Sequence, residues 1–131
     1  MSAKKTDALC PCGSGKYFAG CCGSYIEKSM PAPTAEALMR SRYTAYVRKD
    51  QSYLMQTWHA STRPKDLNLE NNIKWVSLEI ITTKDGRVGD QAGEVEFIAR
   101  YKINGKAEKL HETSRFVNEE GQWFYISGDA R

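Results

Sequence analysis

A chain of 131 residues that is 40% hydrophobic and 27% charged has the composition of one soluble domain with a small appendage. No run of 18 apolar residues occurs and no apolar stretch follows the first lysines, so we expect neither a membrane span nor a secretion signal. The formal charge of +3 arises within residues 1–50, where eight basic groups face four acidic ones, a bias milder than that of a nucleic-acid-binding module.

All four cysteines lie in one stretch, CPCGSGKYFAGCC, which begins at Cys10 and ends at Cys22. We expect a cytoplasmic protein, and disulfides are rare in that reducing compartment. The adjacent Cys21 and Cys22 are also poorly placed for two bridges of ordinary geometry. A redox pair commonly has two residues between its sulfurs, whereas Cys10 and Cys12 have one.

A zinc centre fits this spacing better. Structural zinc takes four tetrahedral ligands, and Gly13 and Gly15 permit the sharp turn that would bring the two thiol pairs together. Lys16 lies inside the loop, where it can offset part of the thiolate charge. Because thiolates would fill every coordination position, we expect a structural and not a catalytic site. The predicted zinc ligands are Cys10, Cys12, Cys21 and Cys22.

The segment SMPAPTAEA, residues 29–37, predicts a boundary, because its prolines favour extended backbone before them. Thr34 can cap a helix that the apolar spacing predicts over residues 34–49. Arg42 falls at the edge of the apolar stripe. It can extend to solvent along its aliphatic stem, or it can point inward to an anion or an acidic partner. Asp50 predicts the cap of a second helix.

From Ile73 onward the apolar period becomes that of strands. In IKWVSLEIITT the alternation puts Val76, Leu78 and Ile80 on one face and Trp75 on the other. EVEFIARYKI alternates strictly, and Asn-Gly at positions 104 and 105 is a strong hairpin signal. KLHETSRFV and QWFYISG predict two more strands, while residues 66–72 can hold a short turn or helix. Helices followed by four antiparallel strands predict an α+β fold.

The cysteine stretch resembles a SEC-C motif, which is known from the C-terminal tail of the SecA motor. The segments LMRSRYTAYVRKD, YLMQTWHASTRP, VEFIARYK and HETSRFV resemble the YchJ-like family of bacterial proteins. That family joins a SEC-C motif to a domain similar to nuclear transport factor 2. The resemblance implies zinc, a partner protein and a cone-shaped fold, in which helices pack on a curved antiparallel sheet around a pocket. We therefore expect a SEC-C-type motif over residues 1–30 and a nuclear transport factor 2-like domain over residues 31–131.

Pocket residues are predicted from the few histidines and from polar groups near the expected concave face. In this hypothesis the side chains surround an anionic small molecule; in the alternative they hydrogen-bond the loop or pair with Glu94 or Glu96 across the sheet. His111 and Glu112 should point to opposite sides of their strand. The candidates are Arg42, Trp58, His59, Arg63, Trp75, His111 and Arg115.

Three functions remain open from the sequence. The first is an interaction module whose zinc motif presents a basic surface to a protein or ribosomal partner. The second is an enzyme, isomerase- or dehydratase-like, or a small-molecule-binding protein that uses the cone pocket; neither a nucleophile elbow nor a complete phosphate loop occurs. The third is nucleic-acid binding through the basic N-terminal half, which the mild charge disfavours. The basic surface comprises Lys4, Lys5, Lys16 and Lys28.

Overall fold

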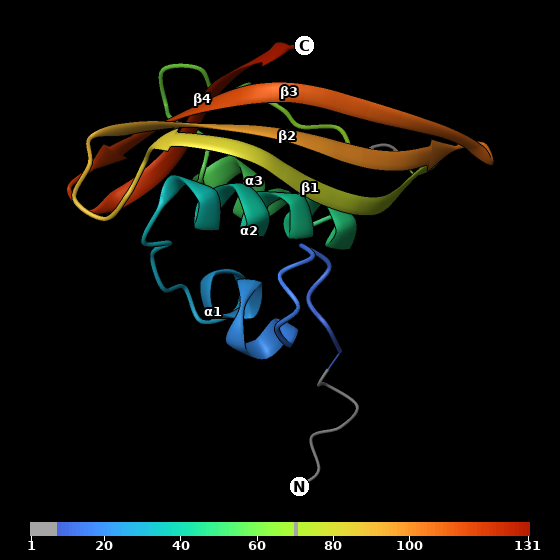
Figure 1. Ribbon diagram of the computed structural model, residues 1–131, viewed down its shortest axis with the longest axis horizontal. Helices are drawn as coiled ribbons and strands as arrows, with labels where there is room; N and C mark the ends of the chain where they lie inside the picture. The colour runs from blue at the N-terminus through green and yellow to red at the C-terminus, as the bar shows by residue number, and fades with distance from the viewer. Residues whose placement is uncertain (1–7, 70) are drawn as a thin grey trace, which may run out of the picture.

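The computed structural model describes residues 8–69 and 71–131, which form an α+β fold in three layers (Figure 1). A curved four-stranded sheet is the first layer, and helices α2 (Ala35–Arg48) and α3 (Gln51–Gln56) lie against one of its faces. The cysteine segment, residues 8–28, packs under α2 on the side away from the sheet. Lys4 and Lys5 of the predicted basic surface lie outside the described residues.

The sheet is an antiparallel meander in which each strand pairs with its neighbour in sequence. The predicted turn at Asn104 and Gly105 joins the second strand to the third, with φ angles of 52° and 81°. Positive φ at both central residues is the geometry of a tight two-residue hairpin. The strands are β1 (Ile73–Asp85), β2 (Ala92–Ile103), β3 (Lys106–Glu119) and β4 (Gln122–Ala130).

One predicted strand face is wrong. Trp75 turns inward onto Tyr43 of α2, with ring centroids 6.1 Å apart, whereas Val76 is 55% exposed. The pairing of β1 with β2 shifts register between Trp75 and Ser77. An extra residue at such a bulge reverses the alternation on one side of it, so Trp75 shares the inner face with Leu78. The alternation predicted for β2 is confirmed.

Both predicted helix caps are confirmed. The Thr34 hydroxyl accepts a hydrogen bond from the Ala37 N–H at 3.0 Å, and the Asp50 carboxylate accepts one from the Tyr53 N–H at 3.0 Å. These bonds satisfy backbone donors that the first turn of a helix leaves open. None of the described helices is long and apolar enough to cross a membrane. The helices are the short η2 (Phe18–Gly20), α1 (Cys22–Ile26), α2 (Ala35–Arg48) and α3 (Gln51–Gln56).

The main core lies between α2 and the concave face of the sheet. Apolar side chains from the helix meet alternate residues of the strands, and the Trp123 indole N–H donates to the Pro33 carbonyl at 3.2 Å. Because α2 is covered by the sheet above and the cysteine segment below, it is buried on more than one side. The buried core comprises Ala32, Ala35, Leu38, Met39, Tyr43, Leu78, Val95, Phe97, Ala99, Phe116 and Trp123.

Candidate functional site

The cysteine segment folds back on itself through its glycines. Gly13 and Gly15 have φ angles of 82° and 85°, a region that glycine enters without the strain of a Cβ. The Cys10 N–H donates to the Lys16 carbonyl at 2.8 Å and closes the turn. The chain then passes through η2, and Cys22 begins α1. The predicted turn therefore brings the first thiol pair against the second.

The four thiols form a compact cluster with metal-site dimensions. Their sulfur atoms all lie within 4.8 Å of one another, and those of Cys12 and Cys21 are 3.7 Å apart. Tetrahedral zinc with thiolate bonds of about 2.3 Å separates two sulfur ligands by about 3.8 Å. This spacing is far longer than the roughly 2.05 Å of a disulfide, and all four cysteines are free. The donor set and its geometry fit one tetrahedral metal ion.

The electrostatics of the cluster also favour a cation. Hydrogen bonding to Cys10 and Cys12, reinforced by burial, raises the pKa of the Cys22 thiol above its ordinary value. Cys10, Cys12 and Cys22 are buried, so water cannot screen several thiolates held this close together. A bound divalent ion would instead favour the thiolate forms, because a coordinated thiol loses its proton.

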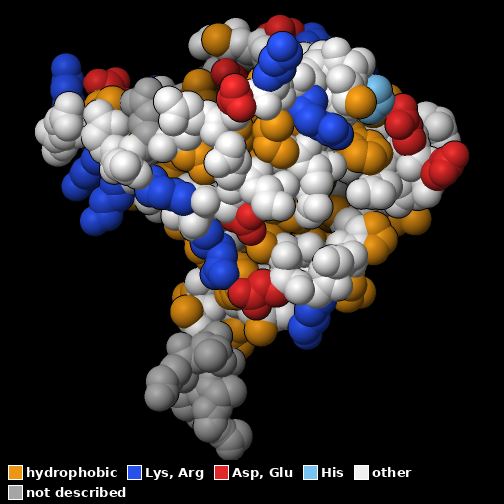
Figure 2. All heavy atoms as spheres, turned by 180° about the vertical axis from the view of Figure 1, so that it is seen from behind, with side chains coloured by type: hydrophobic (Ala, Val, Ile, Leu, Met, Phe, Trp, Pro, Cys, Tyr) orange, Lys and Arg blue, Asp and Glu red, His pale blue; other side chains and the backbone are white. Residues whose placement is uncertain are grey.

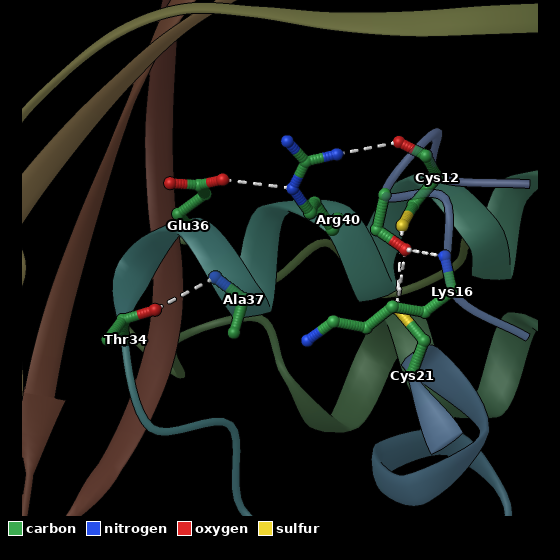
Figure 3. A network of polar contacts seen from close by, with 8 residues as sticks. Cys12, Lys16, Cys21, Thr34, Glu36, Ala37 and Arg40 are labelled. Atoms are coloured by element: carbon green, nitrogen blue, oxygen red, sulfur yellow. Dashed lines mark hydrogen bonds and ion pairs between the residues drawn. The ribbon is translucent and has the colours of Figure 1, made fainter. Parts of the chain in front are cut away.

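One stripe of α2 holds the cysteine segment. Arg40, Thr44 and Arg48 follow one another at four-residue spacing and share one helix face. The Arg40 guanidinium donates to the Cys12 carbonyl at 2.8 Å and pairs with Glu36 at 2.9 Å, as Figure 3 shows. These contacts hold the backbone of Cys12, a candidate metal-binding residue, against α2.

The other two members of the stripe contact the sulfurs and the loop. The Thr44 hydroxyl donates to the Cys22 sulfur at 3.4 Å and lies 3.7 Å from the Cys10 sulfur. Arg48 pairs with Glu27 at 3.0 Å, and its guanidinium stacks 4.4 Å from the centre of the Phe18 ring. The sequence analysis did not identify this stripe. Its signal was three polar residues at four-residue spacing on a predicted helix, a pattern also typical of a solvated face.

A groove runs between the cysteine segment and the beginning of α2. It encloses about 380 Å³ and is lined by Lys16, Cys21, Tyr25, Thr34 and Arg40, among others. In Figure 3 the Lys16 side chain extends from the turn toward the first residues of the helix. The Ser14 hydroxyl accepts from the Lys16 N–H at 3.1 Å and lies 3.2 Å from the Cys21 sulfur. The cysteine cluster and the groove wall are therefore built from the same turn.

A second hollow, the cone cavity, lies on the other side of α2. It encloses about 260 Å³ between the helix and the concave face of the sheet. Of the seven predicted pocket residues, Arg42 and Trp75 line it. Trp58 lies beside it, because its ring centre is 5.0 Å from the Arg42 guanidinium. Of the two sequence interpretations of Arg42, the inward one fits, since only 4% of its surface is exposed.

The structure places the two predicted histidines apart from one another and outside the cone cavity. His59 lies at the turn between β3 and β4, where its ring contacts Glu119 at 2.7 Å and the Ser61 hydroxyl at 2.7 Å. His111 points to the outer face of the sheet and contacts Glu96 at 2.7 Å. Strand alternation explains this placement, because the neighbouring Glu112 takes the inner face.

The two remaining candidates also lie outside the cone cavity. The Arg63 guanidinium donates to the Trp58 carbonyl at 3.0 Å and so fastens the loop that follows α3. Arg115 pairs with Asp129 across β3 and β4. Besides Arg42, the cavity takes polar groups from Glu112 and Ser114, which the sequence analysis did not predict as pocket residues.

Charge is unevenly spread over the sheet. Figure 2 shows basic side chains gathered at the end where β2 turns into β3, and acidic ones beside a histidine at the opposite end. The basic end includes the exposed Arg100, Lys102, Lys106 and Lys109. On the face that Figure 2 shows, one group of cations therefore comes from the second half of the chain.

Comparisons with known proteins agree with this architecture. Residues 34–128 match the family profile described as "YchJ, middle NTF2-like domain", where NTF2 denotes nuclear transport factor 2. A UPF0225 protein of Chromobacterium violaceum is 51% identical over 131 residues, which cover 97% of this chain and 96% of the relative.

Two solved structures share the fold. The solution structure of a SEC-C motif containing protein from Rhodopseudomonas palustris superposes with a TM-score of 0.83 at 32% identity, covering 93% of this chain and 98% of the other. The crystal structure of a SEC-C motif containing protein from Psychrobacter arcticus has a TM-score of 0.77 at 23% identity, covering 93% and 82%. The second likeness concerns the fold alone.

Proposed function

Because the chain belongs to the YchJ-like family, whose middle domain is NTF2-like, we propose that it is a zinc-containing cytoplasmic binding module. In this proposal the metal holds the cysteine segment on α2 and completes a docking groove for a protein partner. The observation that carries the proposal is the cluster of four thiols, whose sulfurs lie within 4.8 Å of one another.

Zinc fits the cluster better than calcium or magnesium, and it is the metal that we propose. Four soft thiolates in a tetrahedral arrangement favour zinc or iron, while calcium and magnesium require oxygen ligands. Bound zinc would stabilise the folded cysteine segment by on the order of 10 kcal/mol. Since four protein ligands complete the tetrahedron, the chain's thiols have a structural role. Free thiols also suit a reducing, cytoplasmic setting.

The groove beside the cluster is the surface that best suits a partner. Lys16 and Arg40 supply two cations to its wall, and Glu36 offsets Arg40 in part. The end of α2 that carries the Thr34 cap adds partial positive charge. A protein segment with acidic side chains complements this surface. The structural similarity to the SEC-C motif containing protein from Rhodopseudomonas palustris supports a partner-binding role. The SEC-C motif is also the one that the sequence analysis related to the C-terminal tail of the SecA motor.

Charge reversal at Lys16 tests this proposal. We expect Lys16→Glu to lose the partners that the wild-type chain retains on an affinity column, with its zinc content unchanged. Lys28→Glu is the matched control, because Lys28 is exposed but does not line the groove. Identical partner sets for Lys16→Glu and the wild type would contradict groove binding. Equal losses in both variants would indicate a diffuse basic surface instead.

A further inference from the structure

The cone cavity has apolar walls. Its apolar lining comes from one side of α2 and from the inner faces of β1, β2 and β3. The ring of Trp75 packs in a tilted arrangement against those of Tyr46 and Tyr101, with centroid distances of 5.8 Å and 5.2 Å. Ligand sites typically combine such apolar walls with a few placed polar groups. The wall residues include Met39, Tyr43, Trp75, Phe97, Ala99 and Leu110.

Arg42 brings a buried positive charge to this apolar space. Its Nη1 atom donates to the Leu54 carbonyl and the Thr57 hydroxyl, each at 2.8 Å, which links α2 to α3. Among the described residues, no carboxylate lies within 4.0 Å of it. Burial lowers the pKa of Arg42, yet a guanidinium stays protonated at neutral pH. A buried cation without an anion is costly, so an anion in the cavity would relieve that cost.

The orientation of Arg42 leaves part of its fork free. The described hydrogen bonds use Nη1, and the guanidinium lies 4.5 Å from the centre of the Tyr125 ring and beside the Tyr46 hydroxyl. Its Nε and Nη2 atoms carry three further N–H groups, and the Tyr46 hydroxyl can accept a hydrogen bond from one of them, which leaves two N–H groups to donate to a ligand. That planar pair matches the two oxygens of a carboxylate.

A second polar group lies on β3. Glu112 and Ser114 share the inner face of the strand and line the same cavity. Burial, with a contribution from Asp129, raises the pKa of Glu112. A carboxyl group in this position disfavours a ligand with a second negative charge. It can instead hydrogen-bond a hydroxyl or amino substituent.

From these contacts we propose that the cone cavity binds a small organic carboxylate. The ligand's carboxylate pairs with Arg42, and its apolar body lies against Trp75 and Phe97. Glu112 and Ser114 hydrogen-bond a polar substituent at the other end. This site is independent of the groove and of the metal, because α2 separates the cone cavity from both.

The test compares benzoate with its neutral isostere benzamide by NMR titration of the full chain. We expect benzoate to shift the amide signals of Arg42, Ala99 and Ser114, with nuclear Overhauser contacts from its ring to Trp75. Benzamide should bind at least about tenfold more weakly, since it lacks the charge that pairs with the guanidinium. Equal affinity for the two probes would overturn the proposal, as would no cavity shifts below about 20 mM benzoate.

Two variants locate the binding. Ala99→Met narrows the cavity from the sheet side while leaving Arg42 in place, and it should abolish the shifts. Ala107→Met is the matched control on the exposed hairpin and should leave them intact. If benzoate shifts only the exposed Lys102, Lys106 and Lys109, it binds the basic end of the sheet and the proposal is wrong. The comparison of benzoate with benzamide uses the wild-type chain. It therefore stays decisive even if Ala99→Met folds poorly.

Discussion

The cysteine segment and the sheet domain are stabilised in different ways. In the sheet domain, eleven buried apolar residues, ten of them in helices and strands, form one core. In the cysteine segment, the buried cluster consists of Cys10, Cys12 and Cys22, three of the candidate ligands, with Phe18, Cys21 and Ile26 packed around them. The sheet domain therefore has a core of its own, whereas the cysteine segment packs on a neighbouring helix and, in our proposal, is held by a metal ion. If so, a few well-placed metal ligands replace an apolar core in that segment.

Removing a thiol should have the largest effect, because it should unfold the cysteine segment and leave the sheet domain folded. We expect Cys12→Ala to lose the metal and about 10 kcal/mol of the stability of the cysteine segment, because the tetrahedron loses a ligand. NMR signals of residues 8–28 should collapse, and those of the α2 stripe should shift. The β3 and β4 signals should stay in place, since their packing lies elsewhere. Loss of all signals together would mean that the two regions fold as one unit.

Truncating a core side chain should destabilise the sheet domain and leave metal binding intact. Phe116 is 1% exposed, so Phe116→Ala should lower the free energy of unfolding by about 3–5 kcal/mol. Urea denaturation followed by tryptophan fluorescence measures this loss. The folded variant should still bind one equivalent of metal. Metal release in the absence of denaturant would show that the cluster depends on the sheet more than we infer.

A substitution at Thr44 tests whether α2 affects the metal affinity of the cysteine segment. Thr44→Val keeps the shape of the side chain but removes the hydroxyl that donates to the Cys22 sulfur. Outer contacts of this kind typically change metal affinity by about 10- to 100-fold. Competition with a chromogenic chelator measures the change. Thr44→Ser restores the hydroxyl and should recover most of the affinity; equal affinity in all three proteins would remove Thr44 from the site.

The smallest expected effect is a loss of folding stability at alkaline pH through Tyr53, which joins α3 to α2. Burial raises the pKa of Tyr53 from 10.0 to about 12, and the Tyr53 hydroxyl contacts that of Ser41 at 2.7 Å. The folded state therefore holds this proton more tightly than the unfolded state. The resulting stability is complete below pH 10 and is lost as the pH rises toward 12. Tyr53→Phe should flatten this decline in urea denaturation curves. An unchanged slope would contradict the assignment.

Local patterns predicted much of the fold. The capping residues Thr34 and Asp50, the Asn-Gly hairpin and the alternation of β2 depend on neighbours in sequence, and the structure confirms all of them. The bulge beside Trp75 does not follow from alternation, because it depends on how β1 pairs with β2. The cysteine cluster was predictable for the same local reason, since its four cysteines lie close together in sequence, from Cys10 to Cys22.

The cone cavity was harder to predict because its residues come from distant parts of the chain. Histidine chemistry favoured His59 and His111, yet both contact acidic residues outside the cavity. Its polar groups are instead Arg42, Glu112 and Ser114. Only the packing of α2 across the concave face brings these three together. A sequence shows which residues share a strand face, but not which face the helix covers.

The most direct test of the account is the metal content and coordination of the full chain, purified without chelators under reducing conditions. We predict one zinc ion per chain, with X-ray absorption giving four sulfur neighbours at about 2.3 Å. A metal-free protein with folded cysteine-segment signals would contradict the account. So would disulfide bonds between these cysteines in material that had never been oxidised.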